Sequence, residues 1–111
     1  MGDIRTIDRE ELKAKIDRGD DFTLIMALND WAFRAQHIPG SIHFHTAEEA
    51  LAGLDPDRDA EIVVYCSDVA CVASQYAYEG LTSAGFTNVR RYEGGLSDWA
   101  EAGYPFESGE E

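Results

Sequence analysis

The chain has 111 residues, of which 44% are hydrophobic and 11% aromatic, so it is long enough and apolar enough to fold as one globular domain. Nine basic against 22 acidic residues give a net charge of −13, which argues against nucleic acid and anionic membranes as partners. No apolar run approaches the roughly 20 residues of a membrane helix, and no secretory signal is recognisable. We expect a cytoplasmic protein whose residues 1–111 form a single domain, ending in an acidic flexible tail at about 107–111.

The first half of the chain alternates helical and strand patterns. Asp8 can cap a helix, with Glu11 three positions later and Gly19 as its stop. Residues 22–28 form a continuous apolar run that indicates a buried parallel strand. A helical turn at 30–36 ends at the Pro-Gly of 39–40, and residues 41–45 alternate like a strand. A capping box at 46–49 opens a short predicted helix that reaches residue 54.

The second half continues the alternation. Residues 61–66 give the clearest strand pattern of the chain. A helix then follows with small side chains on one stripe, formed by Ala73, Ala77, Leu81 and Ala84, and it ends at Gly85. Residues 88–92 predict a last strand, and a turn at 94–95 leads into a short final helix. This order of elements is typical of an α/β sheet.

Cys66 ends the predicted strand 61–66, just before a helix N-terminus. At this edge of an open α/β sheet, backbone N–H groups and the helix dipole favour the thiolate, which is the nucleophilic form of cysteine. A core cysteine would lie inside the apolar run rather than next to Ser67 and Asp68. The position therefore favours an exposed, reactive thiol, and two cysteines without an export signal are typical of a reducing compartment.

Four segments of the chain resemble the rhodanese-like family, and its single-domain sulfurtransferases in particular. They are "HIPGSI" at 37–42, "IVVYC" at 62–66, "LTSAGFTNV" at 81–89 and "YEGGLSDWAEAGYP" at 92–105. Together they extend the resemblance over nearly the whole chain, from about residue 7 to about residue 107. The resemblance implies a rhodanese-like α/β fold, with a central parallel sheet of about five strands and helices on both faces.

The same resemblance implies that Cys66 is the catalytic nucleophile. It would accept a sulfane sulfur from a small donor as a persulfide and pass it to a thiol, to cyanide or to a protein acceptor. We expect neither a metal nor an organic cofactor. The substrate-binding loop would comprise Ser67, Asp68, Val69, Ala70, Val72 and Ala73.

The chain departs from the family at positions that bear on the sulfur donor. Active members often carry an arginine or lysine five residues after the cysteine, but here that position is Cys71, and residues 67–74 contain no basic side chain. The acidic and basic residues that members often place at the end of the second strand correspond to Met26 and Leu28. Without charge-assisted hydrogen bonds to hold it, the dianion thiosulfate is expected to be a poor donor compared with a polysulfide or a small persulfide.

Cys71 has three interpretations. It can act as a resolving thiol that closes a disulfide with oxidised or persulfidated Cys66, it can relay or steady the sulfur, or it can fill space at the start of the helix.

The remaining conspicuous side chains have simpler interpretations. His43 and His45 share a face of a predicted strand, but no spacing typical of a structural zinc site accompanies them. His37 belongs to the turn at 37–40 and is expected to make a hydrogen bond that stabilises the fold. We interpret Trp31 and Trp99 as packing residues, and Arg90 and Arg91 mainly as surface charge balance, although alternation allows one of the two arginines to point towards the active edge.

Two other functions compete with sulfur transfer. One is a non-catalytic rhodanese-like module that binds a partner or senses redox state through its two cysteines. The other is a cysteine phosphatase or arsenate reductase, which needs a loop arginine to clamp an oxyanion and is therefore disfavoured by the loop sequence.

Overall fold

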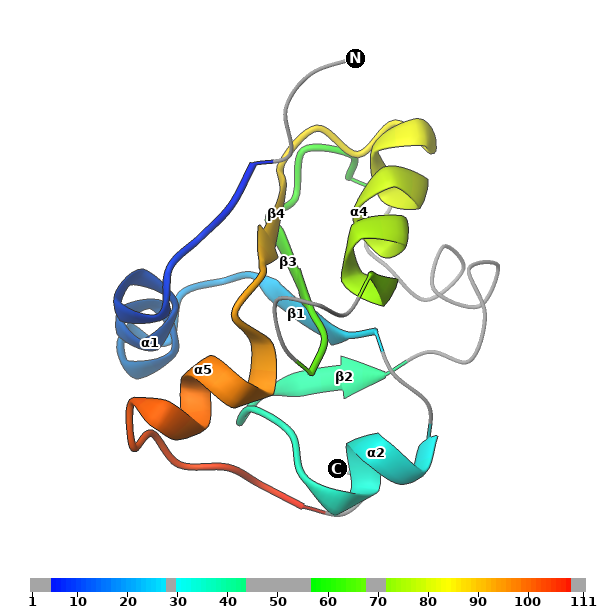
Figure 1. Cartoon of the computed structure of the whole chain (residues 1–111). Helices are drawn as coiled ribbons and strands as arrows, with labels where there is room; N and C mark the ends of the chain where they lie inside the picture. Colours follow the sequence, from blue (N-terminus) through cyan, green and yellow to red (C-terminus); the bar gives the residue numbers. More distant parts are fainter. Residues whose placement is uncertain (1–4, 28–29, 44–56, 68–71, 109–111) are drawn as a thin grey trace.

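The protein is built around a parallel β-sheet, seen in Figure 1. In this computed structural model the described residues are 5–27, 30–43, 57–67 and 72–108. The strands are β1 (Thr23–Met26), β2 (Ser41–His43), β3 (Ile62–Tyr65) and β4 (Val89–Tyr92), in the spatial order β2-β1-β3-β4. All three neighbouring pairs are parallel. The predicted α/β class is confirmed, with four strands among the described residues where about five were expected.

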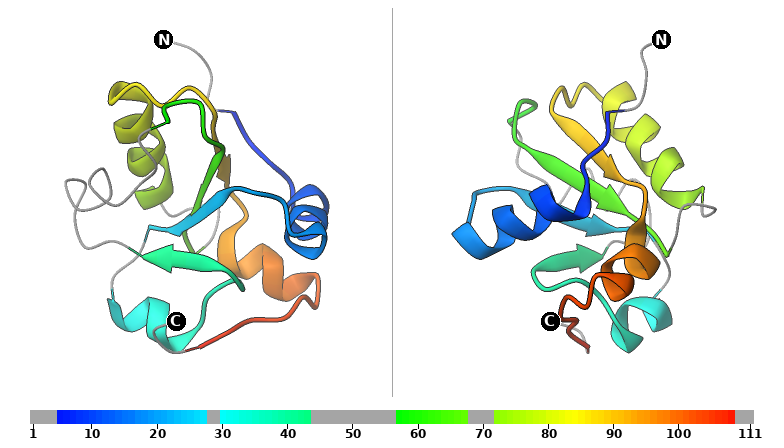
Figure 2. Two further views of the ribbon diagram at one scale, coloured as in Figure 1. Left: turned by 180° about the vertical axis from the view of Figure 1, so that it is seen from behind. Right: turned by 60° about the vertical axis from the view of Figure 1, so that its left-hand side comes forward.

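Helices cover both faces of the sheet (Figures 1 and 2). Helix α4 (Ala73–Ser83) packs on one face, against an apolar cluster that includes Val64 and Val89. The opposite face is covered by α1 (Arg9–Arg18), α2 (Asp30–Ala35) and α5 (Gly95–Glu101), around a second cluster centred on the fully buried Trp99. None of the helices within the described ranges has the length and apolar character to cross a membrane.

The predicted start and end of the first helix are confirmed. The Asp8 carboxylate accepts a hydrogen bond from the Glu11 backbone N–H at 2.8 Å, which satisfies one of the free donors of the first turn. Gly19 follows the last helical residue, and its N–H donates back to the carbonyl of Ile16. The strand expected at 22–28 is shorter, at 23–26, and the capping box and helix predicted for 46–54 lie outside the described residues.

The buried stripe of α4 differs from the expected one. Ser74, Tyr78 and Leu81 are buried, with Ala77 and Ala84 packed partly against the core, whereas Ala73 is not part of the cluster. The predicted stripe was wrong at Ala73 and missed Ser74 and Tyr78, because the helix is rotated to bury a tyrosine ring and to turn a serine hydroxyl towards the sheet. The Tyr78 hydroxyl accepts a hydrogen bond from a backbone N–H of the N-terminal segment.

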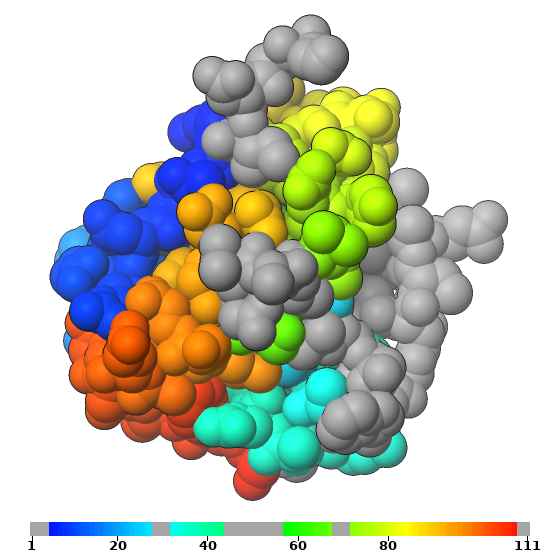
Figure 3. Space-filling model, viewed as in Figure 1, coloured from blue at the N-terminus to red at the C-terminus, as the bar shows by residue number. Residues whose placement is uncertain are grey.

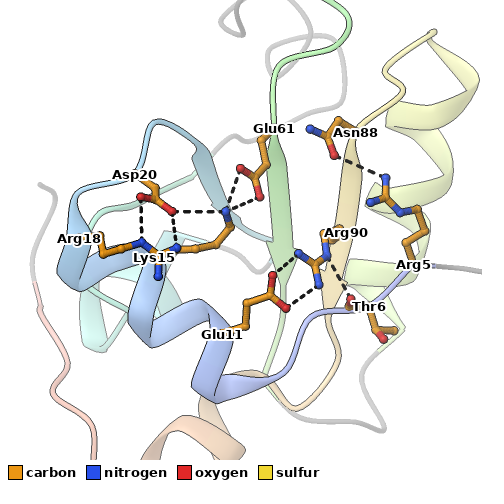
Figure 4. A network of polar contacts seen from close by, with 9 residues as sticks. All are labelled: Arg5, Thr6, Glu11, Lys15, Arg18, Asp20, Glu61, Asn88 and Arg90. Carbon is orange, nitrogen blue, oxygen red and sulfur yellow. Dashed lines mark hydrogen bonds and ion pairs between the residues drawn. The ribbon is translucent and has the colours of Figure 1, made fainter.

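Ion pairs fasten α1 to the edge of the sheet, as Figure 4 shows. The Arg90 guanidinium donates two hydrogen bonds to the Glu11 carboxylate, at 2.7 and 2.9 Å, and it lowers the pKa of Glu11. The Lys15 ammonium lies 2.7 Å from the Glu61 carboxylate. Arg90 therefore balances charge at the surface as predicted, on the α1 face of β4.

Candidate active site

Cys66 follows the last residue of β3, at the carboxyl edge of the sheet. Strand β3 lies between β1 and β4, so the cysteine is central to that edge. Since Tyr65 packs in the cluster on the α1 face, the alternation of the strand places the next residue on the α4 face. The expected exposure of Cys66 is wrong, because the residue is only 1% exposed.

The backbone of Cys66 is held by the first turn of α5. The Leu96 N–H donates to the Cys66 carbonyl at 3.1 Å, and the Ser97 N–H donates to the Ser67 carbonyl at 2.8 Å. Two N–H groups that have no partner inside α5 therefore fix the start of the loop after β3. This contact with α5 helps to explain the low exposure of Cys66. The prediction missed it because the sequence pattern gives no sign that a second helix packs against the end of the strand.

Gly95 allows this close approach. Its φ of +62° lies in the left-handed region, and a Cβ built on it would overlap the carbonyl oxygen of Cys66 and lie 2.9 Å from the carbonyl carbon of Ser67. The sequence predicts only a turn at 94–95. The adjacent pair of glycines was the available signal for a close backbone contact.

A polar network positions the start of α5. The Tyr92 hydroxyl donates to one Asp98 carboxylate oxygen at 2.7 Å, and the Arg9 guanidinium donates to the other at 3.2 Å. Burial and the neighbouring Asp98 carboxylate raise the pKa of the Tyr92 phenol well above its ordinary value. The network joins α1, β4 and α5, so the helix that clamps Cys66 is fixed to both neighbours.

A groove of about 540 Å³ lies beside this network, and it is lined by residues 6–10 and by Tyr92, Glu93, Gly94 and Asp98. None of the lining residues belongs to the predicted substrate-binding loop. The groove is therefore next to the candidate site and not part of it.

Helix α4 begins on the other side of the cysteine without a side-chain cap. Val72 occupies the capping position, makes no side-chain hydrogen bond there, and is 51% exposed. The first turn contains no acidic residue. The free N–H groups and the positive end of the helix dipole are thus not neutralised by a carboxylate from the first turn, which suits an anionic ligand. In the space-filling view, α4 (yellow-green) and the β4–α5 segment (orange) both reach the face of the molecule that is turned towards the viewer (Figure 3).

Arg91 lies on the α4 face of β4 and reaches that first turn. It is 8% exposed, and its Nε donates to the Ser74 hydroxyl at 2.9 Å. One Nη lies 3.6 Å from the Glu93 carboxylate. The expected surface role is wrong for Arg91, because successive strand residues face opposite sides and Arg91 therefore points inward where Arg90 points outward.

The structure places only part of the predicted loop. Ser67 is half-buried, Val72 is exposed and Ala73 is half-buried at the first position of α4. Asp68, Val69, Ala70 and Cys71 lie outside the described residues.

Cys66 is disulfide-bonded in this structure. Since Cys71 lies outside the described residues, its resolving, relay and packing interpretations all stay predictions.

The histidines take no part in the site as described. The Nδ1–H of the fully buried His37 donates to the Phe33 carbonyl at 2.8 Å, and the His37 and Glu107 backbones exchange two hydrogen bonds, which confirms the stabilising role expected of His37. The His43 ring stacks on Phe33. Among the described residues no three potential metal ligands gather, while His45 and the side chain of Trp31 lie outside the description.

The chain is similar to proteins with a known fold or activity. The family model of the rhodanese-like domain matches residues 8–102. The thiosulfate sulfurtransferase GlpE of Pseudomonas savastanoi pv. phaseolicola is 29% identical over 110 residues, which cover 97% of each chain. The solution structure of the rhodanese-like domain of the Anabaena protein Alr3790 superposes with a TM-score of 0.78 at 27% identity, covering 93% of this chain and 78% of that one.

A third relative has a different architecture. The HTH-type transcriptional regulator Rv0324 of Mycobacterium tuberculosis is 37% identical over 105 residues. The match covers 93% of this chain but only 45% of the regulator, so the chain spans less than half the length of that relative.

Proposed function

The chain belongs to the rhodanese-like domain family, and we propose that it is a sulfurtransferase that carries a sulfane sulfur as a persulfide on Cys66. One observation carries the proposal: Cys66 stands at the carboxyl end of a central strand, between the uncapped start of α4 and the first turn of α5. Such an edge favours a thiolate and a bound anion. We also propose a cytoplasmic location and a reaction without a metal or organic cofactor.

The cycle would consist of two displacements. The reduced Cys66 thiolate attacks the outer sulfur of the donor, the donor S–S bond breaks, and the remainder leaves with the bonding electron pair, as sulfite when thiosulfate is the donor. The terminal sulfur of the persulfide is then attacked by a thiolate or by cyanide, and the Cys66 thiolate is restored. The disulfide at Cys66 has to be reduced before this cycle can begin.

Intact-protein mass spectrometry tests the proposal directly. Reduced protein should gain one sulfur atom from polysulfide, and cyanide should remove it as thiocyanate. Cys66→Ser should not gain this sulfur, whereas Ser67→Ala keeps the thiol and should load as the native protein does. Sulfur uptake and release by Cys66→Ser at the native rate would contradict the assignment of the nucleophile.

A non-catalytic, redox-sensing module is the second candidate. One observation favours it: Cys66 is disulfide-bonded in this structure. A thiol that acts only as a sensor should be oxidised and reduced reversibly, without turning over a sulfur donor and an acceptor. Multiple turnovers in the presence of both substrates would therefore exclude this candidate.

A further inference from the structure

We propose that Arg91 supplies the positive charge that the loop after Cys66 lacks, and that it selects for strongly anionic sulfur donors. The inference rests on the proposed function of Cys66. Residues 67–74 contain no lysine or arginine, so a cation for this site has to come from another element. The buried guanidinium of β4 reaches the first turn of α4, the helix that begins where the loop ends.

The register of the sheet places Arg91 next to the strand that carries the cysteine. Arg91 is the partner of Val64 across the β3–β4 pair. Cys66 is the first residue after β3, and strand alternation continued by one residue puts it on the same face as Val64. Two residues advance a strand by about 7 Å. The bond from Nε to the Ser74 hydroxyl shows that the side chain extends in the direction of the strand end, towards the start of α4.

Burial of this guanidinium takes a charged group out of water, although it keeps a hydrogen bond to the Ser74 hydroxyl and an ion pair with Glu93. The neighbouring positions on the α4 face are apolar, as Val64 and Val89 are, and a charged group among them loses hydration. A cation that only balanced surface charge would face outward like Arg90, which pairs with Glu11. An inward arginine that reaches the first turn of α4 is instead suited to stabilise a negative sulfur near Cys66.

The charged groups around this cation are few within the described residues. Glu93 comes from the end of β4 at 3.6 Å and is half-exposed, and the first turn of α4 contributes no acid. From α5, the Asp98 carboxylate accepts hydrogen bonds from Tyr92 and Arg9 on the other face of the sheet. Among the described residues, the positive charge at this edge therefore comes from Arg91 together with the helix dipole of α4.

Two donors of different charge give a selective test. Thiosulfate carries two negative charges, while cysteamine persulfide has an ammonium group that offsets its persulfide. In reduced protein, Arg91→Gln should lower kcat/KM for thiosulfate by about tenfold or more, because a charge-assisted interaction is lost. The value for cysteamine persulfide should fall much less. The pH profile of alkylation of Cys66 should also move to higher pH in this variant, because the thiolate loses a neighbouring cation.

Three further variants separate charge from structure. Arg90→Gln removes an arginine from the opposite face of the same strand and should change neither donor preference nor pH profile. Ser74→Ala breaks the anchoring hydrogen bond but keeps the charge, so it should leave the pH profile close to the native one. Arg91→Lys keeps the charge even if Arg91→Gln does not fold, and it should retain most of the native kcat/KM for thiosulfate.

The outcomes distinguish this inference from the proposed function. If Arg91→Gln matches Arg90→Gln in both readouts, or if Arg91→Lys lowers kcat/KM for thiosulfate and shifts the pH profile as much as Arg91→Gln does, Arg91 has no electrostatic role. If Cys66→Ser still takes up sulfur from either donor, the proposed nucleophile itself is wrong. Loss of uptake in Cys66→Ser with unchanged selectivity in the Arg91 variants would overturn the inference alone.

Discussion

At the scale of single residues, the site depends on a contact between two backbones that have no side chain between them. Gly95 touches the carbonyl group of Cys66, and the N–H groups of the next two residues bind the carbonyls of Cys66 and Ser67. The position of the sulfur is therefore determined by α5 as well as by β3. A residue with a Cβ at position 95 would have to move one of these two elements.

Gly95→Ala is expected to reduce both stability and sulfur loading. The left-handed backbone alone costs alanine about 1–2 kcal/mol, and the contact of its Cβ with the Cys66 carbonyl adds to this cost. Gly103→Ala is a matched control, because Gly103 has a φ of +78° but nothing within 4 Å of its added Cβ. Urea unfolding and mass-spectrometric loading should show a larger loss of stability for Gly95→Ala, with slowed loading in that variant only. Equal stability losses and native loading rates in both variants would show that the contact does not position Cys66.

At the scale of elements, local signals predicted most of the described helices and strands but not their contacts. The cap at Asp8, the stop at Gly19 and the apolar run before Cys66 are read from neighbours in sequence, and each was confirmed. The rotation of α4, the clamp from α5 and the inward direction of Arg91 depend on residues far apart in the chain. Period-two alternation showed that Arg90 and Arg91 face opposite sides, but it could not tell which side was buried.

Tyr65 illustrates such a long-range contact between elements. Its hydroxyl accepts a hydrogen bond from the Ile38 N–H at 3.1 Å and donates to the Ser41 hydroxyl at 2.9 Å, which joins β3 to the start of β2. Burial raises the pKa of Tyr65 to about 12, against an unfolded value near 10. Since the folded state holds this proton more tightly, its contribution is complete below pH 10 and is lost as the pH rises through 12.

The free energy of unfolding should therefore fall by roughly 2–3 kcal/mol between pH 10 and 12 through Tyr65 alone. Tyr65→Phe should be less stable at neutral pH by about 1–2 kcal/mol, since two hydrogen bonds are lost, but its stability should decline less in alkali. Part of the decline should remain, because the pKa of Tyr92 is raised as well. Tyr76→Phe, at an exposed position, serves as the control in urea unfolding across this pH range. The same alkaline decline in Tyr65→Phe as in the native protein would contradict the assignment.

At the scale of the whole molecule, the net charge of −13 and the buried Arg91 have opposite effects on an anionic donor. The many acidic side chains repel a dianion at a distance, whereas Arg91 and the start of α4 attract it only at close range. Salt affects the long-range repulsion and the short-range attraction differently. Repulsion between exposed charges separated by more than about 10 Å is largely screened at 0.1 M ionic strength, while interactions of buried groups are screened much less.

Thiosulfate turnover should consequently increase with salt. Raising the ionic strength from about 0.01 M to about 0.15 M should increase kcat/KM for thiosulfate severalfold, because approach of the dianion becomes easier while binding beside Arg91 is retained. Cysteamine persulfide, with its offset charges, should show little change over the same range. Stopped-flow measurement of persulfide formation with both donors checks the expectation, with an inert salt and constant pH. Efficient thiosulfate turnover that does not depend on salt would contradict this expectation, because it would show that repulsion by the acidic surface does not limit kcat/KM for thiosulfate.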